Sequence, residues 1–220
     1  MGLEFARQLG LRGYDLLLVS NRAEELAAAA SELQGSLPDS QAGGAVAIRT
    51  HWSDLALANA ADNLFSWCME EKIVPDVLVN DAGMFFFKEL GVADLDKVQA
   101  MIHLHVTPVP GLCLLFGEEM KKRGSGYILN VSSMAARLPV PGITVYSATK
   151  AYLKSFGKSL SYEFQPYGVG VTCHHQGMQN IWDLFGRIST GLPVLAGVLL
   201  PHIVQCPVGL GQSLSGRKLL

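Results

Sequence analysis

The stretch Tyr127–Lys150 reads YILNVSSMAARLPVPGITVYSATK and contains an apolar strand followed by the start of a helix. The run Tyr127–Ser132 has the length and composition of a buried strand, and Val145–Gln165 has those of a helix. A strand that leads into a helix is the repeating unit of α/β proteins. This stretch therefore indicates the fold class.

Three polar side chains of this stretch have the chemistry of a proton-transfer site. Tyr146 and Lys150 lie four residues apart, so a helix places them on one face. Free tyrosine has a pKa of about 10, and a neighbouring ammonium lowers it, which permits acid–base catalysis near neutral pH. Ser133 follows the strand and can hold a substrate oxygen. The alternative is an exposed helix turn, because a tyrosine and a lysine at this spacing often occur by chance.

The rest of the chain alternates between apolar strands and helices. The expected strands are Asp15–Ser20, Ala45–Thr50, Asp76–Asn80, Tyr127–Ser132 and Val169–Cys173. The expected helices are Gly2–Leu11, Arg22–Leu33, Ala56–Glu71, Asp94–Lys122 and Val145–Gln165. This order predicts an α/β fold with a doubly wound parallel sheet that helices cover on both faces. Ligands of such sheets bind beyond the carboxyl ends of the strands, where the polar residues singled out here fall.

Two of the expected helices carry informative patterns. Pro108 and Pro110 fall inside Asp94–Lys122, so we expect a kink or a break there. In Val145–Gln165, large or apolar residues recur every four positions, and we expect them to face the core. They are Ala148, Tyr152, Phe156, Leu160 and Phe164.

The composition excludes several classes of function. Of the 220 residues, 49% are hydrophobic and 16% are charged, and the net charge is −2, which predicts one domain over residues 1–220. No basic stripe for nucleic acid and no polybasic membrane patch is present. The four cysteines lie far apart, which favours free thiols in a cytoplasmic protein. No histidine or cysteine cluster has the spacing of metal ligands, so we expect no metal.

The last part of the chain differs from the rest in composition. Residues 188–216 contain no Asp, Glu, Lys or Arg, and this length could span a bilayer. Pro193, Pro201 and Pro207 would break such a helix, which argues against a stable membrane span. We expect residues 1–187 to form the core and residues 188–220 to form an apolar segment on the substrate side. A poorly folded tail is the alternative.

Three motifs in order give the chain a resemblance to the short-chain dehydrogenase/reductase family. They are Asn-Asp-Ala-Gly at Asn80–Gly83, Ile-Leu-Asn-Val-Ser-Ser at Ile128–Ser133 and Tyr-Ser-Ala-Thr-Lys at Tyr146–Lys150. Each motif falls at an expected strand end or on an expected helix. The resemblance covers the chain from Gly2 to about Gly177 and implies a Rossmann-like fold.

The resemblance implies roles for the polar residues already singled out. Tyr146 would be the catalytic acid and base, Ser133 would orient the substrate oxygen, and Lys150 would bind the nicotinamide ribose. The family's catalytic asparagine, which helps to order a proton-relay water, aligns with His105 in Met101–Val106. Histidine can donate and accept protons, so a relay is possible. A hydrogen-bonded helix histidine is the equal alternative.

The implied cofactor is NAD(P), with several contacts placed by the resemblance. Arg22 follows the strand after which an acidic residue would select NAD, and its guanidinium suits a 2′-phosphate, which favours NADP(H) over NAD(H). The alternative for Arg22 is a solvated helix-start residue. The expected cofactor contacts are Gly2, Arg22, Asp54, Leu55, Asn80, Ala82, Gly83, Tyr146, Lys150 and Gly177.

The start of the chain departs from the family pattern. Family members begin with a strand and a glycine-rich turn before the first helix, and Gly2 aligns with the last glycine of that turn. The missing strand would lie between Asp15–Ser20 and Asp76–Asn80. We therefore expect an N-terminally truncated Rossmann-like fold with two interior sheet edges left unpaired.

The expected function is an oxidoreductase that interconverts a carbonyl and an alcohol, with a small hydrophobic molecule as substrate. The Ser133, Tyr146 and Lys150 side chains support this expectation. The resemblance also implies a homodimer or homotetramer formed through the two long helices. The alternative is a truncated, inactive relative that serves as a binding or oligomerisation partner.

Overall fold

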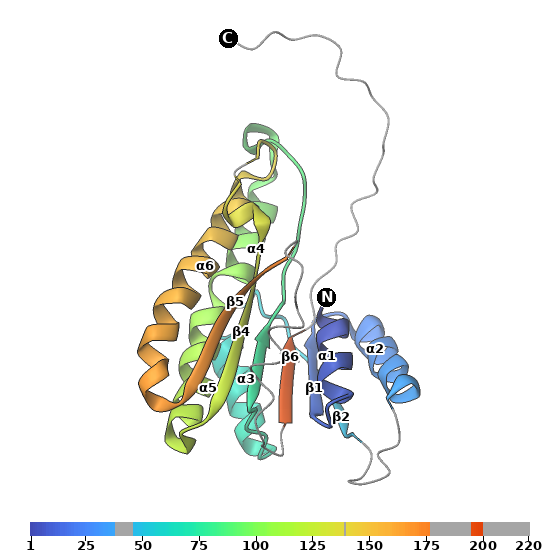
Figure 1. Cartoon of the computed structure of the whole chain (residues 1–220). Coiled ribbons are helices and arrows are strands. Elements are labelled where there is room, and N and C mark those ends of the chain that lie inside the picture. Colours follow the sequence, from blue (N-terminus) through green and yellow to red (C-terminus); the bar gives the residue numbers. More distant parts are fainter. Residues whose placement is uncertain (38–45, 139, 177–194, 200–220) are drawn as a thin grey trace.

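The protein is an α/β structure built on one six-stranded sheet (Figure 1). The computed structural model describes residues 1–37, 46–138, 140–176 and 195–199. The strand order is β2-β1-β6-β3-β4-β5, and every pairing is parallel, as expected from the sequence. The strands are β1 Asp15–Ser20, β2 Ile48–Trp52, β3 Val77–Asn80, β4 Gly126–Ser133, β5 Val169–Gln176 and β6 Leu195–Leu199.

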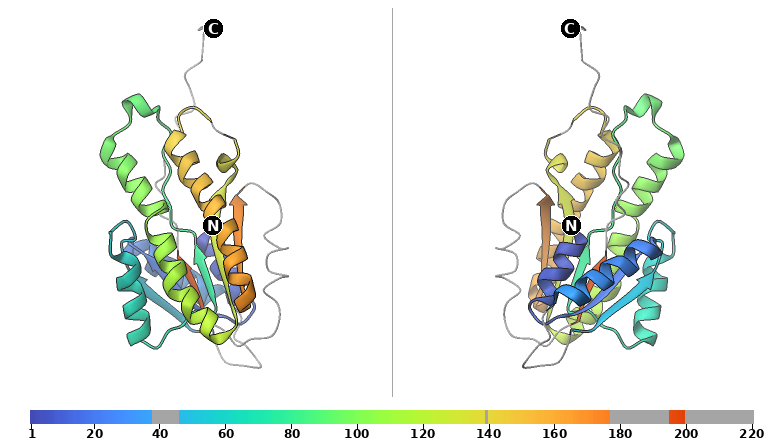
Figure 2. Two further views of the ribbon diagram at one scale, coloured as in Figure 1. Left: turned by 90° about the vertical axis from the view of Figure 1, so that its left-hand side faces the viewer. Right: turned by 90° about the vertical axis from the view of Figure 1, so that its right-hand side faces the viewer.

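Helices cover both faces of the sheet (Figure 2). The helices are α1 Gly2–Gly10, α2 Ala23–Ser36, α3 Ala60–Glu70, α4 Leu95–His105, α5 Pro108–Arg123 and α6 Thr144–Phe164, and short 3-10 turns include η1 Leu90–Val92 and η2 Met134–Ala136. The first two helices pack on one face, where Phe5 and Leu18 belong to one buried cluster. The α3, α5 and α6 helices pack on the other face around a second cluster that includes Phe116 and Leu153. The predicted doubly wound arrangement is confirmed.

The middle of the sheet corrects one expectation. The two interior edges of β1 and β3 are paired, because β6 inserts between them and runs parallel to both. In this register Gly197 lies opposite Leu17 on one side and Leu78 on the other. Strand pairing needs only backbone donors and acceptors, so a segment from late in the chain can satisfy both edges.

The position of β6 also corrects the reading of residues 188–220. Five residues of this segment, Leu195–Leu199, lie inside the sheet and not over a substrate pocket. The rest of the segment, like Gly177 before it, lies outside the described residues.

The long helical pattern of residues 94–122 forms two helices. The α4 helix ends at His105 and α5 begins at Pro108, which confirms the break expected from the prolines. Proline is accepted at the first turn of a helix because that N–H has no intrahelical partner. By length and composition alone, Leu95–Arg123 could cross a membrane, but half of its apolar window is buried within the protein. A buried core helix has the same composition, so this is weak evidence for a span.

The buried face of α6 differs from the predicted one. Leu160 and Phe164 are buried, but Ala148 and Tyr152 are exposed. A spacing of four residues advances about 40° beyond one helical turn, so a strict stripe drifts off the core-facing side. The buried positions mix steps of three and four residues and include Leu153 and Gly157.

Candidate active site

Ser133, Tyr146 and Lys150 converge at the carboxyl end of β4. Ser133 is the last residue of β4, and its hydroxyl makes a side-chain hydrogen bond with Tyr146, which lies in the first turn of α6. The Lys150 ammonium lies 5.7 Å from the centre of the Tyr146 ring. The three residues predicted from the sequence to act together are therefore neighbours. Their catalytic roles stay predictions.

The Lys150 side chain is buried and held by the backbone. It is 5% exposed, and its Nζ donates a hydrogen bond to the Val131 carbonyl at 2.9 Å. Burial lowers the pKa of Lys150 to about 8, although the nearby Asp81 carboxyl acts in the opposite direction. The ammonium form remains the major one at pH 7, because that pH is below the lowered pKa.

The pKa of Tyr146 moves in the opposite direction to the one expected. Burial raises it, and the Ser133 hydrogen bond offsets this effect only in part. Asp81 raises it further, because a nearby negative charge disfavours a phenolate. The lysine ammonium lies over the Tyr146 ring, 5.7 Å from its centre, and donates its hydrogen bond to the Val131 carbonyl. Burial therefore decides the direction in which the pKa of Tyr146 moves. In this structure the Tyr146 hydroxyl is protonated at neutral pH.

Asp81 belongs to the same electrostatic group and was not singled out from the sequence. It follows β3, it is buried, and its carboxylate accepts a hydrogen bond from the backbone N–H of Gly2. Burial raises its pKa to about 7, and Lys150 acts in the opposite direction. Among the described residues, its Oδ2 has no hydrogen-bond partner. The only sequence signal for Asp81 was an acid inside the Asn-Asp-Ala-Gly motif.

His105 lies at the end of α4, beside Tyr146. The two rings meet edge to face with centroids 5.8 Å apart. Both ring nitrogens of His105 have partners, which are the Met84 backbone N–H at 2.8 Å and the Thr149 hydroxyl at 2.9 Å. Burial, together with the Lys150 charge, lowers the pKa of His105 to about 3. Thr149 was not singled out from the sequence, although it lies between the tyrosine and the lysine of their motif.

The turn after β3 brings backbone close to these side chains. Asn80 donates from Nδ2 to Oδ1 of Asn130 at 2.8 Å, which joins the ends of β3 and β4. A Cβ atom at Gly83 would lie 3.0 Å from Nε2 of His105 and 3.7 Å from Nζ of Lys150. Glycine therefore permits this close approach. Ala82 is part of the same turn. The cofactor contacts of Asn80, Ala82 and Gly83 stay predictions.

The remaining predicted cofactor contacts lie at the ends of β1 and β2 and at the start of α1. Gly2 is the first residue of α1, and Arg22 directly precedes α2. The Arg22 guanidinium makes an ion pair with Glu25 at 2.5 Å. Asp54 accepts the backbone N–H of Ala56, and Leu55 is buried. These residues lie on the other side of β3 from Ser133.

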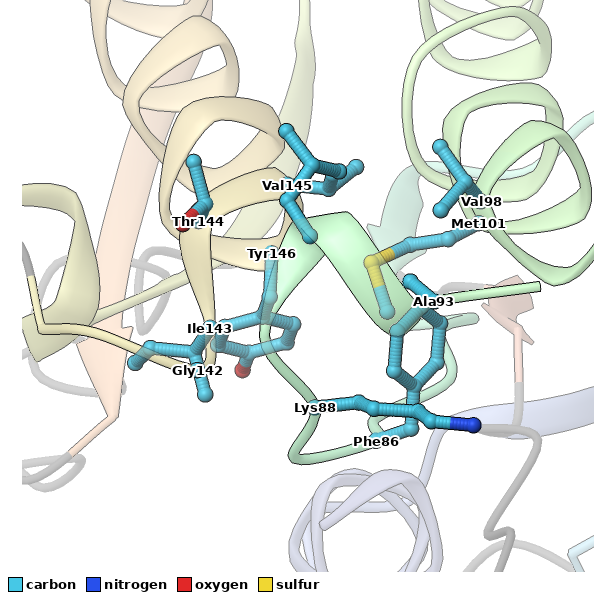
Figure 3. A pocket seen from close by; sticks show the side chains of 11 residues that line it. Phe86, Lys88, Ala93, Val98, Met101, Gly142, Ile143, Thr144, Val145 and Tyr146 are labelled. Carbon is cyan, nitrogen blue, oxygen red and sulfur yellow. The ribbon is translucent and has the colours of Figure 1, made fainter. Parts of the chain in front are cut away.

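A narrow apolar pocket lies beside Tyr146 (Figure 3). Figure 3 shows Phe86 and Lys88 from the segment after β3 facing Val98 and Met101 of α4. Phe85, from the same segment, packs edge to face on the Tyr146 ring at 5.0 Å. The surroundings of the tyrosine are therefore mainly apolar on this side. Among the described residues, no group of three or more His, Cys, Asp or Glu side chains could hold a metal.

The comparisons with known proteins agree with the observed fold. The family model for short chain dehydrogenase matches residues 1–186. A solved metagenomic short-chain oxidoreductase in complex with NADP has a TM-score of 0.74 and 26% identity, over 91% of this chain and 90% of that one.

Two curated relatives share about a third of their aligned residues with the chain. The human very-long-chain 3-oxoacyl-CoA reductase is 32% identical over 175 residues, which are 78% of this chain and 53% of the relative. The 17-beta-hydroxysteroid dehydrogenase type 3 of Mus musculus is 30% identical over 176 residues, which are 77% and 53% of the two chains. The chain thus spans about half the length of these relatives.

Proposed function

The chain belongs to the short-chain dehydrogenase family, and on this premise we propose that it interconverts a carbonyl and an alcohol with a nicotinamide cofactor. The observation that carries the proposal is the meeting of Ser133, Tyr146 and Lys150 at the carboxyl end of β4. A hydroxyl donor, a proton donor and a cation then surround one position where a substrate oxygen can lie.

The protonation state of Tyr146 suits the role of proton donor when a carbonyl is reduced. Tyr146 is protonated at neutral pH because burial raises its pKa, so its hydroxyl can donate a proton to a carbonyl oxygen. Ser133 can donate a second hydrogen bond to the same oxygen. The buried Lys150 ammonium supplies positive charge beside the phenolate that forms. A bound nicotinamide supplies the hydride that the carbonyl carbon accepts.

The described residues fit the nicotinamide ribose of such a cofactor better than its pyrophosphate. Lys150 and the turn of Asn80, Ala82 and Gly83 offer donors and close backbone approach for a nicotinamide ribose. At the start of α1, the Gly2 N–H already bonds to the Asp81 carboxylate. A pyrophosphate at this helix N-terminus would meet that carboxylate, so its binding favours a protonated Asp81.

We further propose NADP(H) as the preferred nucleotide and a hydrophobic substrate. Arg22 supports the first proposal, because its guanidinium can leave Glu25 for a 2′-phosphate. A hollow of about 690 Å³ beside the first turns of α6 supports the second, because apolar side chains such as Ala135, Val140 and Ala151 line most of it. The named relatives act on a long acyl thioester or on a steroid, and both names fit this chemistry.

The association state and the compartment are part of the same proposal. A homodimer or homotetramer through α5 and α6 would cover the exposed side chains of Leu114, Tyr152 and Tyr162. Free Cys68, Cys113 and Cys173 fit a reducing, cytoplasmic environment.

The non-enzymatic alternative is a binding or oligomerisation partner with this fold. One observation in its favour is that the Gly2 N–H already bonds to the Asp81 carboxylate, because such a partner needs no free helix N-terminus for a phosphate.

Nucleotide titration followed by turnover tests the proposal. Trp52 lies at the end of β2, and its indole donates to the Asn21 carbonyl at 3.0 Å, so it reports on the predicted nucleotide side. We expect saturable energy transfer to NADPH, and ketone or 3-oxoacyl thioester reduction that Tyr146→Phe abolishes. Cooperative unfolding without binding of NADPH or NADH would overturn the proposal and leave the non-enzymatic alternative.

A further inference from the structure

The His105 side chain is enclosed within the protein. It is the last residue of α4 and is 1% exposed. Its Nε2 faces the backbone N–H of Met84 at 2.8 Å, and its Nδ1 faces the Thr149 hydroxyl at 2.9 Å. Neither ring nitrogen needs a hydrogen bond to water, because each has a hydrogen-bond partner within the protein.

These partners determine where the single ring proton lies. The Met84 N–H is a donor, so Nε2 must offer its lone pair. The Thr149 hydroxyl donates its only proton to the Tyr146 carbonyl at 2.8 Å, so it must accept from His105. The neutral ring with its proton on Nδ1 is therefore the one form that satisfies all three hydrogen bonds.

The resulting chain of hydrogen bonds joins three elements of the site. It starts in the turn after β3, passes through the end of α4 and ends at the first turn of α6, on the carbonyl of Tyr146 itself. The same turn after β3 leaves no free space beside the ring, because a Cβ at Gly83 would lie 3.0 Å from Nε2. The ring thus sets the distance between the turn and the helix that carries Tyr146 and Lys150.

We propose that His105 is a positioning residue, which acts as a neutral hydrogen-bonded clamp between the turn after β3 and α6 and does not relay protons. The inference rests on the proposed function for its consequence in catalysis, but the state of the ring can be measured without it. A relay would require Nε2 or Nδ1 to release its partner, which would leave a buried polar group unpaired. The other ionisable groups beside the ring are Lys150 and Tyr146 on α6, and Asp81 after β3 acts electrostatically on both of these groups.

Nitrogen-15 NMR of histidine-labelled protein tests the state of the ring directly. We expect one histidine to show the neutral Nδ1–H form unchanged between about pH 5 and pH 8.5, and its signal to vanish in His105→Gln. The variant His103→Asn, at an exposed position of the same helix, should leave that signal intact. Protonation of the ring in this range, or an Nε2–H form, would overturn the proposal whether or not the protein reduces a carbonyl.

A second set of variants tests the clamp and keeps the proposal open to refutation if one variant does not fold. Thr149→Val removes the acceptor and should move the Nδ1 resonance while leaving the exchange of exposed amides unchanged.

In turnover, His105→Gln should keep the shape of the wild-type pH profile, because an amide can also donate and accept. His105→Leu should lower kcat by about tenfold or more with little change in nucleotide KM. A pH profile that loses one limb in His105→Gln would identify a relay.

Discussion

The sheet has two halves that are built differently. Strands β3, β4 and β5, with α4 and α6, form the β4 half, which carries Ser133, Tyr146, Lys150 and His105. Strands β2, β1 and β6, with α1 and α2, form the β1 half, which carries Gly2, Arg22, Asp54 and Leu55. The strands of the β4 half come from one continuous part of the chain, whereas the β1 half takes β6 from far along the sequence.

This difference separates what a fold needs from what a site needs. An interior strand needs backbone donors and acceptors on both sides, and β6 supplies these between β1 and β3. A catalytic group needs particular side chains at particular distances, and the β4 half holds them by bonds such as that from Lys150 to the Val131 carbonyl. The β1 half therefore completes its sheet with a strand from late in the chain, for which backbone groups suffice. The candidate site in the β4 half depends instead on single side chains.

The largest effect should come from Tyr146 in the β4 half. Tyr146→Phe removes the proton donor and should lower kcat/KM by about 10²–10⁴-fold, the usual contribution of a general acid. Nucleotide affinity, measured by energy transfer from Trp52, should change by less than about twofold. Tyr152→Phe, six residues further along α6, is the control and should keep full activity. Equal losses in both variants would contradict a specific role of the Tyr146 hydroxyl in proton transfer.

The next effect should come from β6 in the β1 half. Val198→Pro removes a backbone donor between β1 and β3 and should lower the free energy of unfolding by about 3 kcal/mol or more. Denaturant unfolding followed by circular dichroism measures this change. Val198→Thr keeps the donor and should stay within about 1 kcal/mol of the wild type. Unchanged stability in the proline variant would show that β6 does not complete the sheet.

Acid should weaken the β4 half through His105. Its pKa is about 3 in the folded state and about 6.5 in the unfolded chain, so only the unfolded chain takes up this proton between those values. Stability from this residue is therefore lost as the pH falls below 6.5, by up to about 1.4 kcal/mol per pH unit and about 2 kcal/mol by pH 5.

The raised pKa of Asp81 changes stability in the opposite direction, but it does so equally in wild type and in His105→Gln. The difference between the two proteins therefore isolates the effect of His105. An acid that gains its proton more easily when folded adds stability as the pH falls below about 7. The difference in unfolding free energy between wild type and His105→Gln should thus shrink from pH 7 to pH 5. A difference that is constant over this range would rule out the buried neutral ring.

The smallest effect should come from Arg22 in the β1 half. Arg22→Ala should weaken NADPH binding by about tenfold, or about 1.4 kcal/mol, and leave NADH binding unchanged. Glu25→Gln should strengthen NADPH binding, because it removes the carboxylate that pairs with Arg22. Equal changes for both nucleotides in either variant would show that Arg22 does not contact a 2′-phosphate.

Much of the fold could be predicted because local pattern and tertiary structure agree. The run Asp15–Ser20 forms β1 with the predicted bounds, and Pro108 begins α5 at the expected break. The stripe on α6 was wrong because it was read as a strict repeat of four, and the helix has 3.6 residues per turn. The role of β6 could not be predicted, since nothing local in Leu195–Leu199 specifies its distant partners.

The sequence by itself determined the alternation of strands and helices and the placement of Ser133, Tyr146 and Lys150 near one sheet edge, because both follow from local periodicity and parallel pairing. Only the tertiary structure decided the insertion of β6, the raised pKa of Tyr146 and the ring state of His105. Each of these depends on groups distant in sequence that exclude water or provide hydrogen bonds. Burial and hydrogen-bond partners, and not residue type, decide the protonation of the Tyr146 hydroxyl and of the His105 ring.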